Sequence, residues 1–166
     1  MDQEAAGFQD RQRPDSGRGP LLSAIYLDAA YVAKCYLRER DALAVREMVR
    51  GASAAYTSAW TIAEVACVFH RHQREGTLNS RTAREVRDQF QQDLRDETWL
   101  LIPVTAGILR QVELAARTLP KQVFLRAGDA VHIVSAADAG FSEIWTNDRH
   151  LLSAAPHFGL RGRSAS

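Results

Sequence analysis

Four acidic residues stand almost alone among apolar or small side chains, and this pattern restricts the folds that the chain can adopt. They are Asp28, Glu64, Asp129 and Asp148. The first three are each the only formal charge in the windows 21–33, 58–69 and 127–137. A carboxylate in a core element is costly unless a cation, a metal ion or hydrogen bonds compensate its charge. Because these windows contain no lysine or arginine, we expect the missing partner to be a hard divalent cation, Mg²⁺ or Mn²⁺, which prefers oxygen ligands.

The composition is that of an ordinary soluble domain. A length of 166 residues favours one domain, and a net charge of +1 provides no global field that would steer the protein to nucleic acid or to a membrane. No apolar run approaches the length of a membrane span. Cys35 and Cys67 lack metal-type spacing, so we interpret both as reduced core residues of an intracellular protein. We therefore expect a cytoplasmic protein with no membrane partner.

Short apolar runs alternate with amphipathic stretches along most of the chain. The runs 24–27, 54–57, 99–104 and 143–146 predict strands, and the stretches 29–37, 41–50, 58–74, 80–97, 106–118 and 129–139 predict helices. This alternation predicts an α/β fold with a parallel sheet covered by helices on both faces. We expect a polar, disordered extension over residues 1–20, one domain over residues 21–155, and a flexible tail over residues 156–166.

A parallel sheet would gather the four acidic residues at one edge. Asp28 and Asp148 end predicted strands, whereas Glu64 and Asp129 lie in the first turns of predicted helices. In open α/β sheets the functional site lies beyond the carboxyl ends of the strands. The sequence therefore predicts a single acidic site at this edge.

Each acid also has a simpler structural explanation. Asp28 could cap the following helix, and Asp148 could lie in a turn. The negative charge of Asp129 could simply be stabilised by the dipole at a helix N-terminus. Thr61 and Glu64 match the spacing of a capping box. Caps explain neither the absence of other charges around these acids nor their shared edge, so we favour a metal site for the set.

Several neighbouring residues are weaker candidates. Arg126, Arg149 and His150 flank the acids and are candidates for contacts with a phosphate backbone. His132 lies in an apolar helix and is interpreted as a satisfied core histidine. Trp60 and Trp145 could stack on bases, but core packing is the preferred interpretation for both.

Four segments carry a family resemblance. They are Ile25-Tyr26-Leu27-Asp28, Thr57 to Val65 (TSAWTIAEV), Leu125 to His132 (LRAGDAVH) and Thr146 to Leu151 (TNDRHL). In this order they resemble the motifs of PIN-domain ribonucleases, with the VapC-type toxins of bacterial toxin–antitoxin modules as the nearest subgroup.

The resemblance implies a three-layer α/β/α fold with a short central parallel sheet and a protruding helical hairpin. It implies an endoribonuclease that depends on Mg²⁺ or Mn²⁺, with Asp28, Glu64, Asp129 and Asp148 as the catalytic and metal-binding residues. Thr146 would support the site by hydrogen bonding. The implied partners are an RNA substrate, a cognate antitoxin and a second copy of the chain in a homodimer.

One departure from the family keeps other functions open. Ala29 and Ala30 follow Asp28, where the family often has a serine or threonine. The missing hydroxyl favours an alternative in which the domain is catalytically weak and binds RNA or a partner. An acidic-site phosphatase is a less favoured alternative, because Lys34 and Lys121 are poorly placed for that chemistry.

Overall fold

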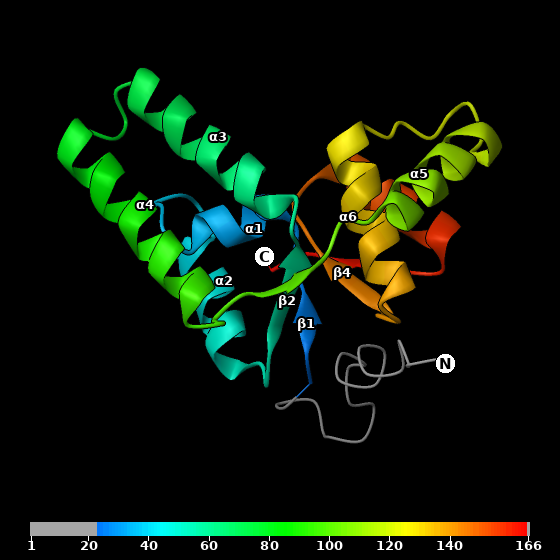
Figure 1. Cartoon of the computed structure of the whole chain (residues 1–166), viewed down its shortest axis with the longest axis horizontal. Helices are drawn as coiled ribbons and strands as arrows, with labels where there is room; N and C mark the ends of the chain where they lie inside the picture. The colour runs from blue at the N-terminus through cyan, green and yellow to red at the C-terminus, as the bar shows by residue number, and fades with distance from the viewer. Residues whose placement is uncertain (1–22, 166) are drawn as a thin grey trace, which may run out of the picture.

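The computed structural model describes residues 23–165, so the expected extension over residues 1–20 lies outside the described residues (Figure 1). The strands are β1 (Ile25–Tyr26), β2 (Ala55–Ser58), β3 (Leu100–Ile102), β4 (Glu143–Trp145) and β5 (Arg161–Arg163). The helices are α1 (Ala29–Lys34), α2 (Ala42–Gly51), α3 (Thr61–Arg74), α4 (Ser80–Arg95), α5 (Ala106–Thr118), α6 (Ala127–Asp138), α7 (Arg149–Ala154) and the 3₁₀ turn η1 (Ala155–Phe158).

The strands form a short parallel sheet, as the alternating pattern predicts. β2 lies between β1 and β3, and β4 pairs with β5. A parallel bridge between Leu27 and Trp145 connects the two groups of strands. All of these pairings are parallel, so the carboxyl ends of the strands lie at the same edge.

Helices cover both faces of the sheet and confirm the three-layer α/β/α architecture. Adjacent strand residues point to opposite faces, so Leu27 packs in one core cluster and Tyr26 in the other. The first cluster lies against α1, α2, α3 and α4, and the second lies against α6 and α7. On β2, Ala55 likewise packs in the first cluster and Tyr56 in the second.

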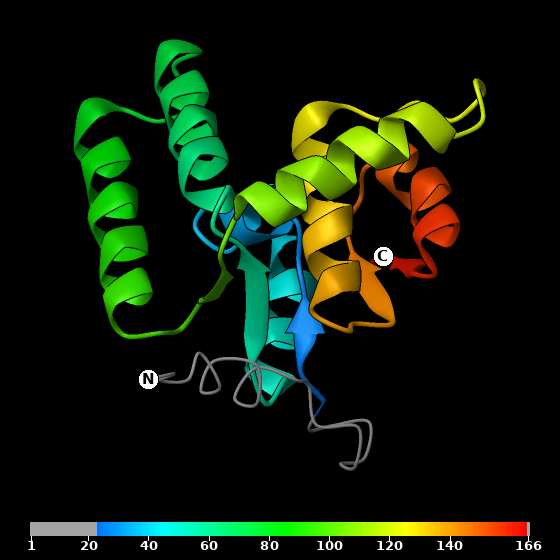
Figure 2. The same ribbon diagram turned by 45° about the vertical axis from the view of Figure 1, so that its right-hand side comes forward.

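The helices α3 and α4 form the expected hairpin, which extends away from the sheet in both views (Figures 1 and 2). Phe69 of α3 packs edge-on against Phe90 of α4, with ring centroids 6.2 Å apart. Gly76 turns the chain between the two helices with a φ of 74°, a conformation that glycine adopts without steric strain. The cap of α4 is Asn79, whose side chain accepts a hydrogen bond from the Thr82 backbone N–H.

The chain end differs from the expected flexible tail. Leu160 is buried in the second core cluster, and residues 161–163 form β5 beside β4. The flanking arginines of β5 are polar, so this edge strand lacks the apolar run that identified the others. A Cβ added to Gly162 would lie 2.8 Å from Leu152 Cδ2 and 3.1 Å from its Cα, so the close packing of β5 on α7 requires glycine.

Candidate active site

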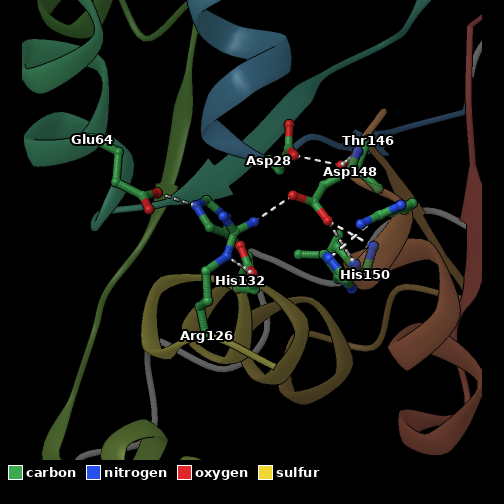
Figure 3. Close-up of polar contacts among 10 residues, drawn as sticks. Asp28, Glu64, Arg126, His132, Thr146, Asp148 and His150 are labelled. Carbon is green, nitrogen blue, oxygen red and sulfur yellow. Dashed lines mark hydrogen bonds and ion pairs between the residues drawn. The ribbon is translucent and has the colours of Figure 1, made fainter. Parts of the chain in front are cut away.

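The four isolated acids all lie at the carboxyl edge of the sheet. Asp28 follows β1 by two residues, and Asp148 follows β4 by three residues. Glu64 and Asp129 lie in the first turns of α3 and α6. Figure 3 shows Asp28, Glu64 and Asp148 around the same region, with Arg126 and His132 between them. Contacts through Thr146 and Arg126 connect Asp28, Asp148 and Asp129, and Glu64 lies beside Gly128, the residue before Asp129.

Thr146 joins the two acids at the strand ends. Its Oγ1 donates to Asp28 Oδ2 at 2.5 Å and accepts from the Asp148 backbone N–H at 2.9 Å. Asp28 Oδ1 accepts from the Tyr31 backbone N–H at 2.8 Å, so this carboxylate also caps α1. Asp148 caps α7 through Oδ1, which accepts from the backbone N–H groups of His150 and Leu151. Capping is therefore real at both positions, and it also orients the two carboxylates.

The surroundings shift the pKa values of these two aspartates in opposite directions. Burial raises the pKa of Asp28, and its hydrogen bond with Thr146 only partly opposes the effect. Burial alone would also raise the pKa of Asp148, but the N–H donors of Leu151 and His150 and the Arg126 guanidinium lower it overall. Within residues 23–165 Asp28 has no ion pair, so it is a buried carboxylate whose charge lacks a cationic partner.

The guanidinium of Arg126 is the cationic partner of Asp129 and Asp148. Its Nε donates to Asp129 Oδ2 at 2.8 Å, and its Nη2 donates to Asp148 Oδ2. The contact with Asp129 is the main reason that the pKa of Arg126 is raised, so the guanidinium remains charged. The sequence placed Arg126 beside the acids as a phosphate contact, whereas the structure places it between two of them.

Glu64 belongs to a different buried network. His132 Nε2 lies 2.8 Å from Glu64 Oε2, and Nδ1 lies 3.1 Å from the Tyr26 hydroxyl. Burial and then the nearby Asp28 charge raise the pKa of Tyr26 well above its usual value, so the phenol remains protonated and can donate to Nδ1. When Nδ1 accepts from Tyr26, Nε2 is the ring nitrogen that donates to the Glu64 carboxylate. His132 is the satisfied core histidine that the sequence predicted, and it also orients one of the four acids.

The capping box suggested for Thr61 and Glu64 is not formed. Trp60 occupies the N-cap position of α3 without a side-chain cap, and Thr61 Oγ1 instead lies 2.6 Å from Thr57 Oγ1. The Glu64 carboxylate is therefore free of a local structural role and turns toward α6.

Gly128 allows α3 and α6 to approach closely at the site. A Cβ at this position would lie 2.5 Å from Glu64 Oε1 and 3.3 Å from Trp60 Nε1. The glycine directly precedes Asp129. The close approach at Gly128 therefore brings the first turn of α3, which carries Glu64, beside the first turn of α6, which carries Asp129. The sequence analysis predicted neither the role of Gly128 nor that of Tyr26. For Gly128 a signal was available, because this glycine stands immediately before an isolated aspartate at the start of a helix.

The site fits a hard divalent cation in its donor chemistry. Its donors are carboxylate oxygens, and the buried Asp28 lacks a counter-charge. Among residues 23–165, however, no three His, Cys, Asp or Glu side chains are grouped to hold a metal ion in this arrangement. Arg126 occupies one oxygen each of Asp129 and Asp148, and His132 occupies one oxygen of Glu64. A cation bound by Asp28, Asp129 and Asp148 would therefore have to replace the Arg126 guanidinium.

The remaining predicted residues lie at the margin of the site or outside it. His150 and Arg149 contact each other on α7, at 3.4 Å between Nε2 and Nε. Trp145 is partly buried under Arg163, but Trp60 is exposed, so the interpretation of Trp60 as a core residue is wrong. Cys67 is likewise exposed and not a core residue. Residues 23–165 contain no helix that is both long and apolar enough to span a bilayer.

The comparison with protein families agrees with this geometry. The model of the PIN domain matches residues 25–156, which include all four acids and every buried residue of the two core clusters except Leu160. A comparison with curated proteins finds no match to this chain. PIN domains are generally metal-dependent nucleases. The chain belongs to the PIN-domain family.

Proposed function

We propose that this PIN-domain protein is an endoribonuclease that uses Mg²⁺ or Mn²⁺ to hydrolyse phosphodiester bonds in RNA. The observation that supports the proposal is that Thr146 and Arg126 connect Asp28, Asp148 and Asp129 at the carboxyl edge of the sheet, with Glu64 beside Gly128. A merely structural cluster of this kind would be unfavourable, because like charges and buried carboxylates destabilise the folded state.

The residues of the chain divide into those that hold the cation and those that orient them. Asp28, Glu64, Asp129 and Asp148 would hold the ion. Thr146 fixes the plane of the Asp28 carboxylate, and His132 fixes that of Glu64. When bound, a divalent cation would acidify a water molecule and neutralise negative charge on the phosphodiester, so no side-chain nucleophile is needed.

The exposed basic residues would bind the substrate. Arg126 is about half exposed, and it would exchange the carboxylates for a phosphate once a metal ion neutralises them. Arg149 and His150 lie beside Asp148 on α7 and are further candidates for the same backbone.

The direct test is cleavage of a structured RNA by the purified protein. We expect cleavage with Mg²⁺ or Mn²⁺, no cleavage in EDTA, and loss of activity in Asp28→Asn and Asp129→Asn. Circular dichroism and thermal melting serve as controls that both variants are folded. Equal activity in excess EDTA would rule out the metal-dependent mechanism.

We further propose that the protein is the toxin of a VapC-type pair, with an antitoxin that masks the acidic site. Asp129 and Asp148 already bind a guanidinium from Arg126, so an arginine of a partner could bind them in the same way. The α3–α4 hairpin offers a helical surface beside the site on which a partner segment could lie. The test is co-expression with the product of an adjacent small gene, which should co-purify and suppress both toxicity and cleavage. Failure to co-purify, with toxicity and cleavage unchanged, would reject the antitoxin and leave the nuclease in place.

A homodimer is part of the same proposal. α5 exposes Leu109 and Leu114, which would be covered more favourably in an assembly than in water. Light scattering of the purified protein should give twice the mass of 18.5 kDa.

A specific observation favours one alternative. In the described structure the guanidinium of Arg126 neutralises two of the four acids, and alanines stand at positions 29 and 30. A domain that keeps this arrangement permanently would bind RNA or a partner without cleaving it. RNA binding without cleavage at saturating Mn²⁺ would support this alternative.

A further inference from the structure

Two exposed aromatic side chains stand apart from the rest of the structure. Among the Phe, Tyr and Trp residues in the range 23–165, only Trp60 and Phe124 are exposed, at 44% and 54%. Neither belongs to a core cluster. Large aromatic side chains lose favourable burial when they face water, so two of them beside one site need an explanation.

Phe124 lies on the Asp148 side of the site. It belongs to the segment between α5 and α6, two residues before Arg126. Its ring centroid lies 4.6 Å from that of His150, and the planes are inclined by 54°. The backbone N–H of His150 in turn donates to Asp148 Oδ1 at 2.7 Å. Figure 3 shows His150 beside Asp148, so the Phe124 ring is connected to the site through one residue.

Trp60 lies on the Glu64 side of the site. It directly precedes α3, and its indole Nε1 would lie 3.3 Å from a Cβ placed on Gly128. The same hypothetical Cβ would lie 2.5 Å from Glu64 Oε1. The two exposed aromatic residues therefore flank the row of acids, and the exposed guanidinium of Arg126 lies between them.

This order matches the alternation of a nucleic acid strand, in which each phosphate lies between two bases. An exposed ring provides a stacking surface for a base, and an arginine between two such rings provides a contact for the phosphate. A base within a duplex is already stacked on its neighbours and cannot use such a surface, whereas an unpaired base in a loop can.

We propose that Phe124 with His150 forms one base-stacking subsite and Trp60 forms a second, and that they hold the unpaired nucleotides on either side of the scissile phosphate. The inference rests on the proposed ribonuclease function and assigns to these residues the selection of the cleavage position. The ligand of each subsite is the face of a single nucleobase.

The test uses short single-stranded RNA that carries the fluorescent base 2-aminopurine, with EDTA present so that the RNA stays intact. Stacking quenches the fluorescence of this base. We expect the wild-type protein to quench it, and Phe124→Ala to weaken binding by roughly 5- to 150-fold, the effect of losing one stacked base. Phe124→Trp should retain binding. Phe124→Leu, which keeps an apolar side chain without a ring, should not.

The matched control is Leu43→Ala, which removes an exposed apolar side chain of α2 and should leave RNA binding unchanged. Trp60→Ala should weaken binding in the same way as Phe124→Ala, with the loss at a different base position. RNA with an abasic nucleotide at the stacked position should bind the wild type and Phe124→Ala equally.

Wild-type binding by Phe124→Ala or Phe124→Leu would overturn the proposal. An equal loss for duplex RNA or for the abasic RNA would also overturn it, since the effect would then not depend on an unpaired base. Unchanged RNA binding with a changed oligomeric state would identify Phe124 as part of a protein interface instead. The assay needs no catalysis, so a protein that stacks bases but does not cut RNA with Mn²⁺ would refute the nuclease function alone.

Discussion

Nε2 of His132 lies 2.8 Å from Oε2 of Glu64, although 68 residues separate them in the sequence. The contact crosses from α6 to α3, and the other oxygen of the same carboxylate lies beside Gly128. The histidine is buried, whereas the Glu64 side chain is about one third exposed. Because a buried donor restricts the position of this carboxylate, a change that moves Glu64 should affect activity more than stability.

Gly128→Ala tests this relationship. The new methyl group would overlap Glu64 Oε1, so the carboxylate must move and its hydrogen bond with His132 weakens. The helix propensity of alanine, higher than that of glycine by about 1 kcal/mol, offsets this loss of stability. We expect RNA cleavage to fall about 10- to 100-fold, as for other residues that orient metal ligands, with a nearly unchanged melting temperature.

The matched control for Gly128→Ala is Gly51→Ala, because a Cβ at Gly51 meets nothing within 4 Å. Activity of this control should equal that of the wild type. A fully active Gly128→Ala protein would show that the position of Glu64 does not limit the reaction.

Asp148 has two roles that substitution can separate. Asparagine is as good an N-cap as aspartate, so Asp148→Asn should keep the cap of α7 and remove the charge. Asp148→Ala should lose both, with a destabilisation of about 1 kcal/mol. We expect both variants to lose metal-dependent cleavage, and only the alanine variant to melt at a lower temperature. If neither variant changes cleavage, Asp148 is only a cap.

Asp28→Asn should stabilise the protein in EDTA at neutral pH. Burial raises the pKa of Asp28 in the folded state, so the ionised carboxylate opposes folding there. The stability difference between variant and wild type should therefore grow as the pH rises through the folded-state pKa. It should be smallest below about pH 4, the unfolded value. Thermal melting as a function of pH measures it, and a wild type that is more stable at pH 7 would contradict the prediction.

The same substitution should abolish stabilisation by metal. Added Mn²⁺ should raise the melting temperature of the wild type, because a ligand that binds only the folded state stabilises it. Asp28→Asn should show no such increase. The two melting series therefore separate the charge effect from metal binding.

Arg126→Gln should strengthen metal binding in the absence of RNA. The guanidinium pairs with Asp129 and Asp148. An exposed ion pair of up to about 1 kcal/mol would lower the affinity of the site for a competing cation about fivefold. Isothermal titration calorimetry with Mn²⁺ measures this change in affinity. RNA affinity should fall in the same variant, because a phosphate contact is lost.

Arg149→Gln is the control for charge in this metal titration. It changes the net charge equally, and within the described residues Arg149 has no ion pair with an acid. Equal effects of both substitutions on Mn²⁺ affinity would indicate a general electrostatic effect and not competition by Arg126.

Much of the fold follows from local patterns. Short apolar runs predicted β1 to β4, because a strand that is buried on both faces has apolar residues throughout. Helical periodicity predicted α1 to α6, because a helix that is buried on one face has apolar residues at every third or fourth position. β5 escaped prediction because Arg161 and Arg163 give it a polar pattern. Its place depends on contacts with Glu143 and Trp145 that a local pattern does not contain.

The sequence by itself singled out the four acids, because an isolated carboxylate in an apolar window is costly wherever the chain folds. It also predicted the edge of the sheet at which they lie, through the parallel order of the strands. Only the tertiary structure decided how these acids are neutralised: Arg126 lies between Asp129 and Asp148, His132 holds Glu64, and Thr146 joins Asp28 to Asp148. These pairings depend on the distances between side chains from separate elements, which spacing along the chain does not specify.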